Sequence, residues 1–148
     1  MLELARATRS MPGKKIVEGL GEFEMIAQAA PHLFGSLFSF GVSEPRGHEG
    51  SAVHRYSPRE LSELFRVGIA RPDSPLFAIL GAPEAHSRSP EYHNGRFVRD
   101  GIDALYVHLR ADSFPGFLAI TDELGLDGAS CGGTATRGIS GDRGNTCC

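Results

Sequence analysis

Two serines stand where a predicted strand is followed by a predicted helix, and their spacing favours anion binding. Ser87 and Ser89 flank Arg88 and directly precede Pro90, a residue type that favours the first helical position. Two hydroxyl groups at a helix amino terminus, with its free backbone amides and the positive end of its dipole, can bind a carboxylate or phosphate. A simple N-cap role for Ser89 is the alternative, because serine is preferred at that position.

The residues around this pair alternate between apolar runs and amphipathic stretches. Residues 76–81 are almost continuously apolar, which is typical of a strand buried on both faces of a parallel sheet. The elements predicted to follow are a helix from Ser89 to Gly101, a strand over 104–109, a helix over 114–124 and a strand over 126–129. This β-α-β-α-β order indicates parallel strands joined by right-handed crossovers, with ligands bound at the carboxyl ends of the strands.

Residues 81–94 read Gly-Ala-Pro-Glu-Ala-His-Ser-Arg-Ser-Pro-Glu-Tyr-His-Asn and closely resemble the substrate-binding motif of shikimate dehydrogenase. The resemblance continues through 102–109, Phe117-Leu118 and 128–130. It implies that Ser87 and Ser89 hydrogen-bond the carboxylate of shikimate, and it makes Ser130 a secondary candidate for substrate binding. It also implies NADP as the cofactor of the full-length family, which interconverts 3-dehydroshikimate and shikimate.

Four neighbouring side chains are expected to support this site rather than react. His86 lies next to a tight turn and is interpreted as a structural hydrogen-bonding residue, not as a general base. His93 and Asn94 lie on the helix behind the loop and are expected to orient it. Tyr106 alternates with apolar residues in a strand, so core packing is its expected role.

The helix predicted from Ser89 to Gly101 should have an apolar side that packs on the sheet. That side is expected to consist of Tyr92, Phe97 and Val98.

The groups that carry out the chemistry in this family have no counterpart here. In the family, the catalytic lysine follows the third strand in a Val-Thr-x-Pro-x-Lys pattern, but Cys131-Gly132-Gly133-Thr134 stands in that place and no lysine follows Lys15. No Gly-x-Gly-x-x-Gly turn follows a strand either. We therefore expect no catalytic residue and no bound NADP in this chain. The Gly- and Cys-rich tail 131–148 cannot build a core, and the abrupt change favours a frameshift or an artificial terminus over a divergent natural tail.

The first segment of the chain predicts a different fold. Strands are expected over 15–20 and 36–41, a helix over 24–32, and a further helix that starts at Ser57-Pro58-Arg59-Glu60 with a capping box. These elements resemble the last two β/α units of type I 3-dehydroquinate dehydratase, a (β/α)8 barrel. Ser51 is a secondary substrate-contact candidate on that resemblance, while the Schiff-base lysine of the family lies on earlier strands that are missing here.

The predicted fold class is therefore α/β, with a partial barrel end followed by the parallel start of a substrate-binding domain. The expected organisation is a dehydratase-like remnant over 1–70, a linker over 71–75, a shikimate dehydrogenase-like domain over 76–130 and the tail. Dehydratase followed by dehydrogenase is the order of the bifunctional enzyme that joins these two families.

Composition limits the partners that can be expected. The 148 residues are 41% hydrophobic and 22% charged, and their net charge of −3 provides no basic excess for nucleic acid. No apolar run approaches the roughly 18 residues that a membrane span needs, and no apolar leader is visible, so a cytoplasmic location is expected. The three cysteines lack metal-ligand spacing, and no metal is expected: Cys131, Cys147 and Cys148.

Two classes of function remain open on the sequence. One is the substrate-binding region of an NADP-dependent shikimate dehydrogenase, with shikimate and 3-dehydroshikimate as its small-molecule partners. The other is a non-catalytic module that binds shikimate or quinate, or that has a regulatory role. Shikimate binding without turnover fits both classes, whereas binding of quinate alone favours the second.

Overall fold

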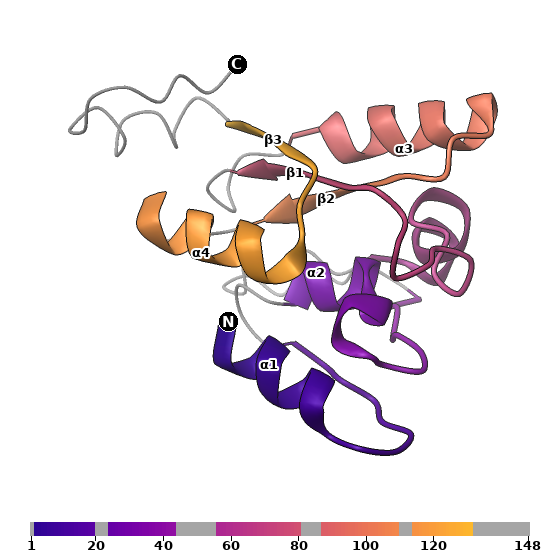
Figure 1. The fold of residues 1–148 in the computed structure, drawn as a ribbon. Helices are drawn as coiled ribbons and strands as arrows, with labels where there is room; N and C mark the ends of the chain where they lie inside the picture. Colours follow the sequence, from indigo (N-terminus) through magenta and orange to yellow (C-terminus); the bar gives the residue numbers. More distant parts are fainter. Residues whose placement is uncertain (1, 20–23, 44–55, 81–86, 110–113, 132–148) are drawn as a thin grey trace, which may run out of the picture.

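The computed structural model describes residues 2–19, 24–43, 56–80, 87–109 and 114–131. Within these residues, three parallel strands form one sheet in the order β2-β1-β3, with helices on both faces (Figure 1). The strands are β1 (Leu76–Leu80), β2 (Leu105–Leu109) and β3 (Gly128–Cys131). α3 (Ser89–Asp100) lies on one face, and the other side holds α4 (Phe114–Leu124), α2 (Glu24–Ala29) and α1 (Leu2–Ser10).

The predicted β-α-β-α-β order is confirmed; β2 begins at Leu105, one residue later than predicted, and the start of β3 is displaced further. We expected that strand over 126–129, but it begins at Gly128. The Leu126 amide instead donates to the Thr121 carbonyl and closes the end of α4. Asp127 exchanges two hydrogen bonds with Leu76: its amide donates to the Leu76 carbonyl, and its carboxylate accepts from the Leu76 amide, both at 2.8 Å.

The two faces of β1 pack against different partners, as alternation along a strand requires. Phe77 faces α3, where its ring centroid lies 6.2 Å from that of Phe97. Leu76, Ala78 and Leu80 point to the opposite face and join the main hydrophobic core. That core also contains residues of the first half of the chain, among them Ile26, Ala30, Phe34, Leu61 and Phe65.

The apolar side predicted for α3 is wrong for two of its three residues. Tyr92 and Val98 are 66% and 47% exposed, and Phe97 is half-buried. The buried positions of α3 are Pro90 and Asn94. The helix meets the sheet along the narrow stripe of positions 90, 94 and 97, so positions 92 and 98 project away from it. Its predicted end at Gly101 is confirmed by a φ of 67° there.

The strands predicted over 15–20 and 36–41 are wrong within the described residues. Only one parallel bridge joins the two segments, between Lys15 and Ser36. The Ser36 hydroxyl accepts from the Val17 amide and donates to the Phe38 carbonyl, so a side chain takes the place of ladder partners. No strand flanks this pair in the part of the chain that the structure describes, and two isolated strands are marginal in water. The barrel end is therefore not confirmed.

The helix predicted over 24–32 is divided in two. α2 ends at Ala29, and a 3₁₀ turn, η2 (Pro31–Phe34), follows after Ala30. The cause is Pro31, which lacks an amide hydrogen and disfavours helical backbone at the residue before it. Ala30 accordingly has φ −133° and ψ 58°.

The capping box predicted at the next helix start is confirmed. The Ser57 amide donates to a Glu60 carboxylate oxygen at 2.8 Å, and the Glu60 amide donates to the Ser57 hydroxyl at 3.2 Å. One turn of π-helix follows, η3 (Glu60–Leu64), and Leu61 and Phe65 are buried. The Phe65 ring packs against Tyr56 at a centroid distance of 4.4 Å.

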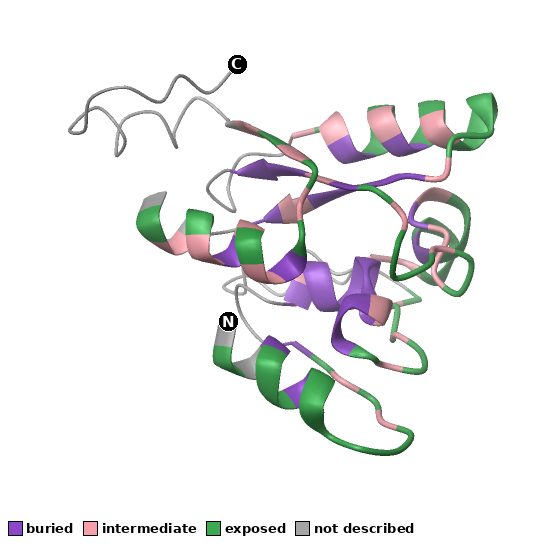
Figure 2. Ribbon diagram, viewed as in Figure 1, coloured by how far each residue is buried: buried purple, intermediate pink, exposed green. Residues whose placement is uncertain are grey.

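The two halves of the chain share this hydrophobic core. Figure 2 shows buried residues of the first half facing buried residues of the sheet. The predicted linker over 71–75 also contacts the second half, because Arg71 donates to the Asp103 carboxylate at 2.6 Å. Arg66 adds a longer ion pair to Asp103 at 3.8 Å. The predicted domain boundaries stay a prediction, since a shared core neither requires nor excludes them.

Candidate functional site

The candidate serines lie at the carboxyl edge of the sheet, where parallel α/β folds bind ligands. Ser89 is the first residue of α3, which follows β1 in the chain, and Ser130 is near the carboxyl end of β3. Ser87, Ser89 and Ser130 are all partly exposed. Residues 81–86, with His86, and the candidate Ser51 lie outside the described residues.

Ser87 and Ser89 form a directly hydrogen-bonded pair. The Ser87 hydroxyl donates to the Ser89 hydroxyl at 3.0 Å, and it accepts from the Ser89 amide at 3.3 Å. The N-cap position is occupied by Arg88, without a side-chain cap. The capping alternative for Ser89 is therefore wrong: Ser89 already has helical backbone, and the upstream Ser87 covers its amide. Two hydroxyl groups thus meet beside the positive end of a helix of 12 residues.

Asn94 fixes β2 to α3. Its side-chain amide donates to the Tyr106 carbonyl at 2.7 Å, and its side-chain carbonyl accepts from the Tyr106 amide at 2.8 Å. Asn94 is 1% exposed. The expected role of Asn94 and His93 in orienting the loop falls partly on residues 81–86, so it stays a prediction.

Tyr106 is buried, as its predicted core role requires, but it also has a polar contact that the sequence analysis missed. Its hydroxyl lies 2.6 Å from the Ser130 hydroxyl. The His93 ring stacks on the Tyr106 ring with centroids 4.5 Å apart and an interplanar angle of 19°. The signal that could have found the contact is the register: Tyr106 and Ser130 face the same side of the sheet once β1 is placed between their strands.

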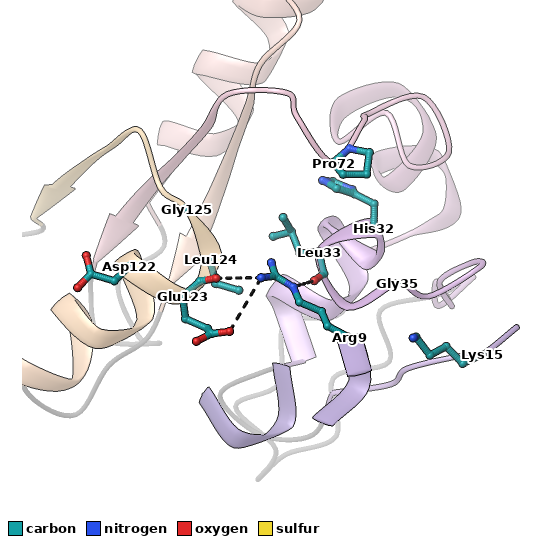
Figure 3. A pocket seen from close by; sticks show the side chains of 10 residues that line it. All are labelled: Arg9, Lys15, His32, Leu33, Gly35, Pro72, Asp122, Glu123, Leu124 and Gly125. Carbon is teal, nitrogen blue, oxygen red and sulfur yellow. Dashed lines mark hydrogen bonds and ion pairs between the residues drawn. The ribbon is translucent and has the colours of Figure 1, made fainter. Parts of the chain in front are cut away.

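A cleft of about 480 Å³ lies at the opposite end of the sheet (Figure 3). Its lining includes Pro72, which precedes β1, and Gly125, which precedes β3. Arg9 crosses it, and donates to the backbone carbonyls of Leu33 at 2.8 Å and Glu123 at 3.0 Å. The cleft therefore adjoins the amino ends of the strands, away from the serine pair.

Three charged groups of the cleft, those of Arg9, Lys15 and Glu123, have partners inside the protein. The Glu123 carboxylate pairs with Arg6 at 2.7 Å and with Arg9 at 4.0 Å. Lys15 donates to the Met11 carbonyl at 2.8 Å. Burial lowers the pKa of His32, which favours a neutral ring at neutral pH. The serine pair is the better candidate site because its hydroxyl groups converge at a helix start.

Membrane spans and metal-ligand clusters are absent from the described residues. None of the described helices has the length and apolar character needed to cross a membrane. Among the described side chains, no three His, Cys, Asp or Glu residues cluster as metal ligands. The Cys131 side chain and residues 132–148, which include the other two cysteines, are outside the description.

Comparison with known proteins identifies related sequences. No family model matches the chain. It is 29% identical over 112 residues to the chloroplastic bifunctional 3-dehydroquinate dehydratase/shikimate dehydrogenase of Arabidopsis thaliana, a match that covers 76% of this chain and 18% of that protein. It is 56% identical over 34 residues to shikimate dehydrogenases (NADP(+)) of Anaeromyxobacter sp. strain K and Anaeromyxobacter dehalogenans strain 2CP-1, covering 23% of this chain and 12% of each relative.

These matches confirm the family resemblance. The chain contains a region related to shikimate dehydrogenase. Matches to only 12% and 18% of the relatives mean that the chain corresponds to a small part of each. A match of 112 residues is longer than the predicted domain 76–130, so the similarity to the bifunctional enzyme extends beyond that domain.

Proposed function

We propose that this chain binds shikimate through the hydroxyl groups of Ser87 and Ser89, as the substrate-binding part of a shikimate dehydrogenase. The observation that carries the proposal is the hydroxyl pair, with its oxygens 3.0 Å apart at the start of α3. The position of this pair at the carboxyl edge of a parallel sheet supports the proposal, and so does the similarity to shikimate dehydrogenases.

The chemistry of the pair suits a carboxylate. In the free protein, the Ser87 hydroxyl donates a hydrogen bond to the Ser89 hydroxyl. On binding, rotation about two side-chain bonds turns both hydroxyl protons toward the two carboxylate oxygens, while the dipole of α3 adds a favourable field. Arg88, between the serines, pairs with Glu91 at 3.3 Å.

The parent reaction in this proposal is the NADP-dependent reduction of 3-dehydroshikimate to shikimate. The sequence contains no Gly-x-Gly-x-x-Gly motif, and the residues that follow β1 in the chain are Gly81-Ala82-Pro83, so these residues do not fit the dinucleotide. The catalytic lysine expected from the family resemblance has no counterpart, since no lysine follows Lys15. We accordingly propose substrate binding, without turnover, for these 148 residues.

Isothermal titration of the full chain with shikimate tests the proposal. Two charge-assisted hydrogen bonds contribute roughly 1.5–3 kcal/mol each, so Ser87→Ala/Ser89→Ala should weaken binding at least tenfold. Ser10→Ala is the matched control, because Ser10 is an exposed serine at a helix end whose hydroxyl donates to the Ala7 carbonyl within its own helix. Unchanged affinity in the double variant, or no binding by the natural chain, would refute the proposal.

Two further measurements separate the remaining alternatives. With NADPH and 3-dehydroshikimate, the chain should consume no NADPH, and steady consumption would show that another group replaces the missing lysine. Quinate is the second ligand for titration. Binding of quinate without shikimate would favour a non-catalytic module over a dehydrogenase part.

A further inference from the structure

The face of the sheet that α3 covers carries a second pair of hydroxyl groups, formed by Tyr106 of β2 and Ser130 of β3. The two residues are on the outer strands of the sheet, with β1 between them. Tyr106 is paired with Phe77 of β1, and Phe77 is paired in turn with Gly128 of β3. The Tyr106 ring must therefore cross β1 for its hydroxyl to reach Ser130 at 2.6 Å.

The position of Tyr106 is fixed by α3. Asn94 binds both its backbone amide and its backbone carbonyl, and the His93 ring stacks on its ring at 4.5 Å. The ring is 6% exposed, so few other orientations are open to it. Gly128 has no side chain on this face, and a Cβ there would lie 3.2 Å from the Phe77 ring.

The contact leaves one hydroxyl proton for an outside partner. Two hydroxyl groups have two protons between them, and one is used in the shared hydrogen bond. Either hydroxyl could be the donor in this contact, and we assign that role to Tyr106 because a phenol is a stronger donor than an aliphatic alcohol. The Ser130 proton then has no acceptor among the described residues, and Ser130 is the more exposed residue of the two. An alcohol is a suitable ligand group, because its oxygen can accept that proton.

This second pair lies close to the proposed carboxylate site. Ser89 and His93 are four residues apart on α3, which is about 6 Å along the helix axis, and His93 contacts Tyr106 directly. We infer that Tyr106 is a positioning residue that orients Ser130 toward a ligand hydroxyl, so that the site selects hydroxylated ring carboxylates over unsubstituted ones. The inference rests on the proposed function, because the carboxylate is assigned to Ser87 and Ser89.

Binding of two ligands to the full chain tests the inference. Shikimate carries ring hydroxyl groups, whereas cyclohex-1-ene-1-carboxylate has the ring and the carboxylate alone. Tyr106→Phe should weaken shikimate binding by about 3- to 10-fold, the range expected for one net hydrogen bond. Its affinity for the unsubstituted acid should stay within about twofold of the natural chain. Tyr92→Phe is the matched control, because Tyr92 is a tyrosine of α3 that is 66% exposed.

Ser130→Ala probes the same contact from the other strand and keeps the tyrosine ring in place if Tyr106→Phe fails to fold. It should also weaken shikimate binding selectively. The variant that combines Tyr106→Phe with Ser130→Ala should bind shikimate as tightly as Ser130→Ala alone, because both changes remove the same contact.

The outcomes separate the two proposals. If neither ligand responds to Ser87→Ala/Ser89→Ala, the proposed function fails. Suppose that Ser87→Ala/Ser89→Ala weakens the binding of both ligands. If Tyr106→Phe and Ser130→Ala then change the affinities for both ligands equally, or change neither, the inference is overturned and the proposed function stands. Selective loss of shikimate affinity supports the inference.

Discussion

At the scale of single residues, the Asn94 side chain forms the hydrogen bonds with β2 that a neighbouring strand would otherwise form. β2 is an edge strand of the described sheet, and Asn94 offers Tyr106 one donor and one acceptor. Buried backbone groups are nearly always paired, so this side chain accounts for both polar groups of Tyr106 that β1 does not use. The same contact ties the strand to the helix that starts with the candidate serine.

Asn94→Ala should therefore destabilise the protein. Two backbone groups would lose their partners in a buried position, and the free energy of unfolding should fall by about 2 kcal/mol or more. Urea unfolding monitored by circular dichroism measures the change. Arg99→Ala is the control on the same helix, because the Arg99 side chain is 61% exposed. A loss below about 0.5 kcal/mol, the range of ordinary surface substitutions, would contradict this account of Asn94.

At the scale of elements, some helices and strands could be predicted from local sequence, whereas others depended on the segments that pack beside them. The apolar run of β1 and the capping box formed by Ser57 and Glu60 each depend on a few consecutive residues, and both were predicted. The segments 15–20 and 36–41 have strand-like sequences but no described flanking strands, and they form one bridge. Strand formation there depends on partners that periodicity cannot supply.

The candidate site divides in the same way. The pair of Ser87 and Ser89 lies within three consecutive residues, so its spacing could be recognised from the sequence. Tyr106 and Ser130 are 24 positions apart. Their contact depends on the order and register of three strands, and the alternation along one strand showed only that Tyr106 would be buried.

The ion pairs between the segment before β1 and the turn before β2 predict a pH dependence. Desolvation opposes the shift, but hydrogen bonds from Ser74 and Arg71 and the charges of Arg71 and Arg66 hold the pKa of Asp103 below its ordinary value of 3.8. The unfolded state therefore binds protons more readily at Asp103. This contribution to stability is present above the ordinary pKa and is lost as the pH falls through the folded pKa.

Asp103→Asn should remove that pH dependence. The natural chain should have a higher urea midpoint than the variant at neutral pH, and the difference should shrink as the pH falls below the ordinary aspartate pKa of 3.8. Asp73→Asn is the control, because Asp73 also contacts Arg71 but its side chain is 82% exposed. A difference that stays constant with pH would show that Asp103 acts through its shape and not its charge.

At the scale of the whole molecule, the two halves depend on one core. Ile26, Phe34 and Phe65 belong to the same cluster as Ala78 and Val107 of the sheet. A sheet of three strands with so much apolar surface on one face needs that cover. This shared core predicts that the two halves of the chain unfold together.

Phe34→Ala tests this cooperativity. Phe34 is 1% exposed, and its truncation should cost about 3–5 kcal/mol. In native-state hydrogen exchange, the amide of Ala30, which donates to the Ile26 carbonyl at 2.8 Å, and the amide of Ala78 should lose the same protection, because both open with the shared core. Phe38→Ala, at a 46% exposed position, should change neither. Loss of protection at Ala30 alone would show that the halves unfold independently.

The pair of hydrogen bonds between Asn94 and the backbone of Tyr106 also affects the chemical ageing of the protein. Asn94 is followed by Gly95, and Asn-Gly is the dipeptide most prone to deamidation in flexible chains. Here the amide is helical, buried and bound on both its nitrogen and its oxygen, so the folded state protects it. Each unfolding event removes that protection, and conversion to aspartate would replace the donor to Tyr106 with a buried negative charge. Damage at this one position would accumulate with time spent unfolded and would make refolding progressively harder.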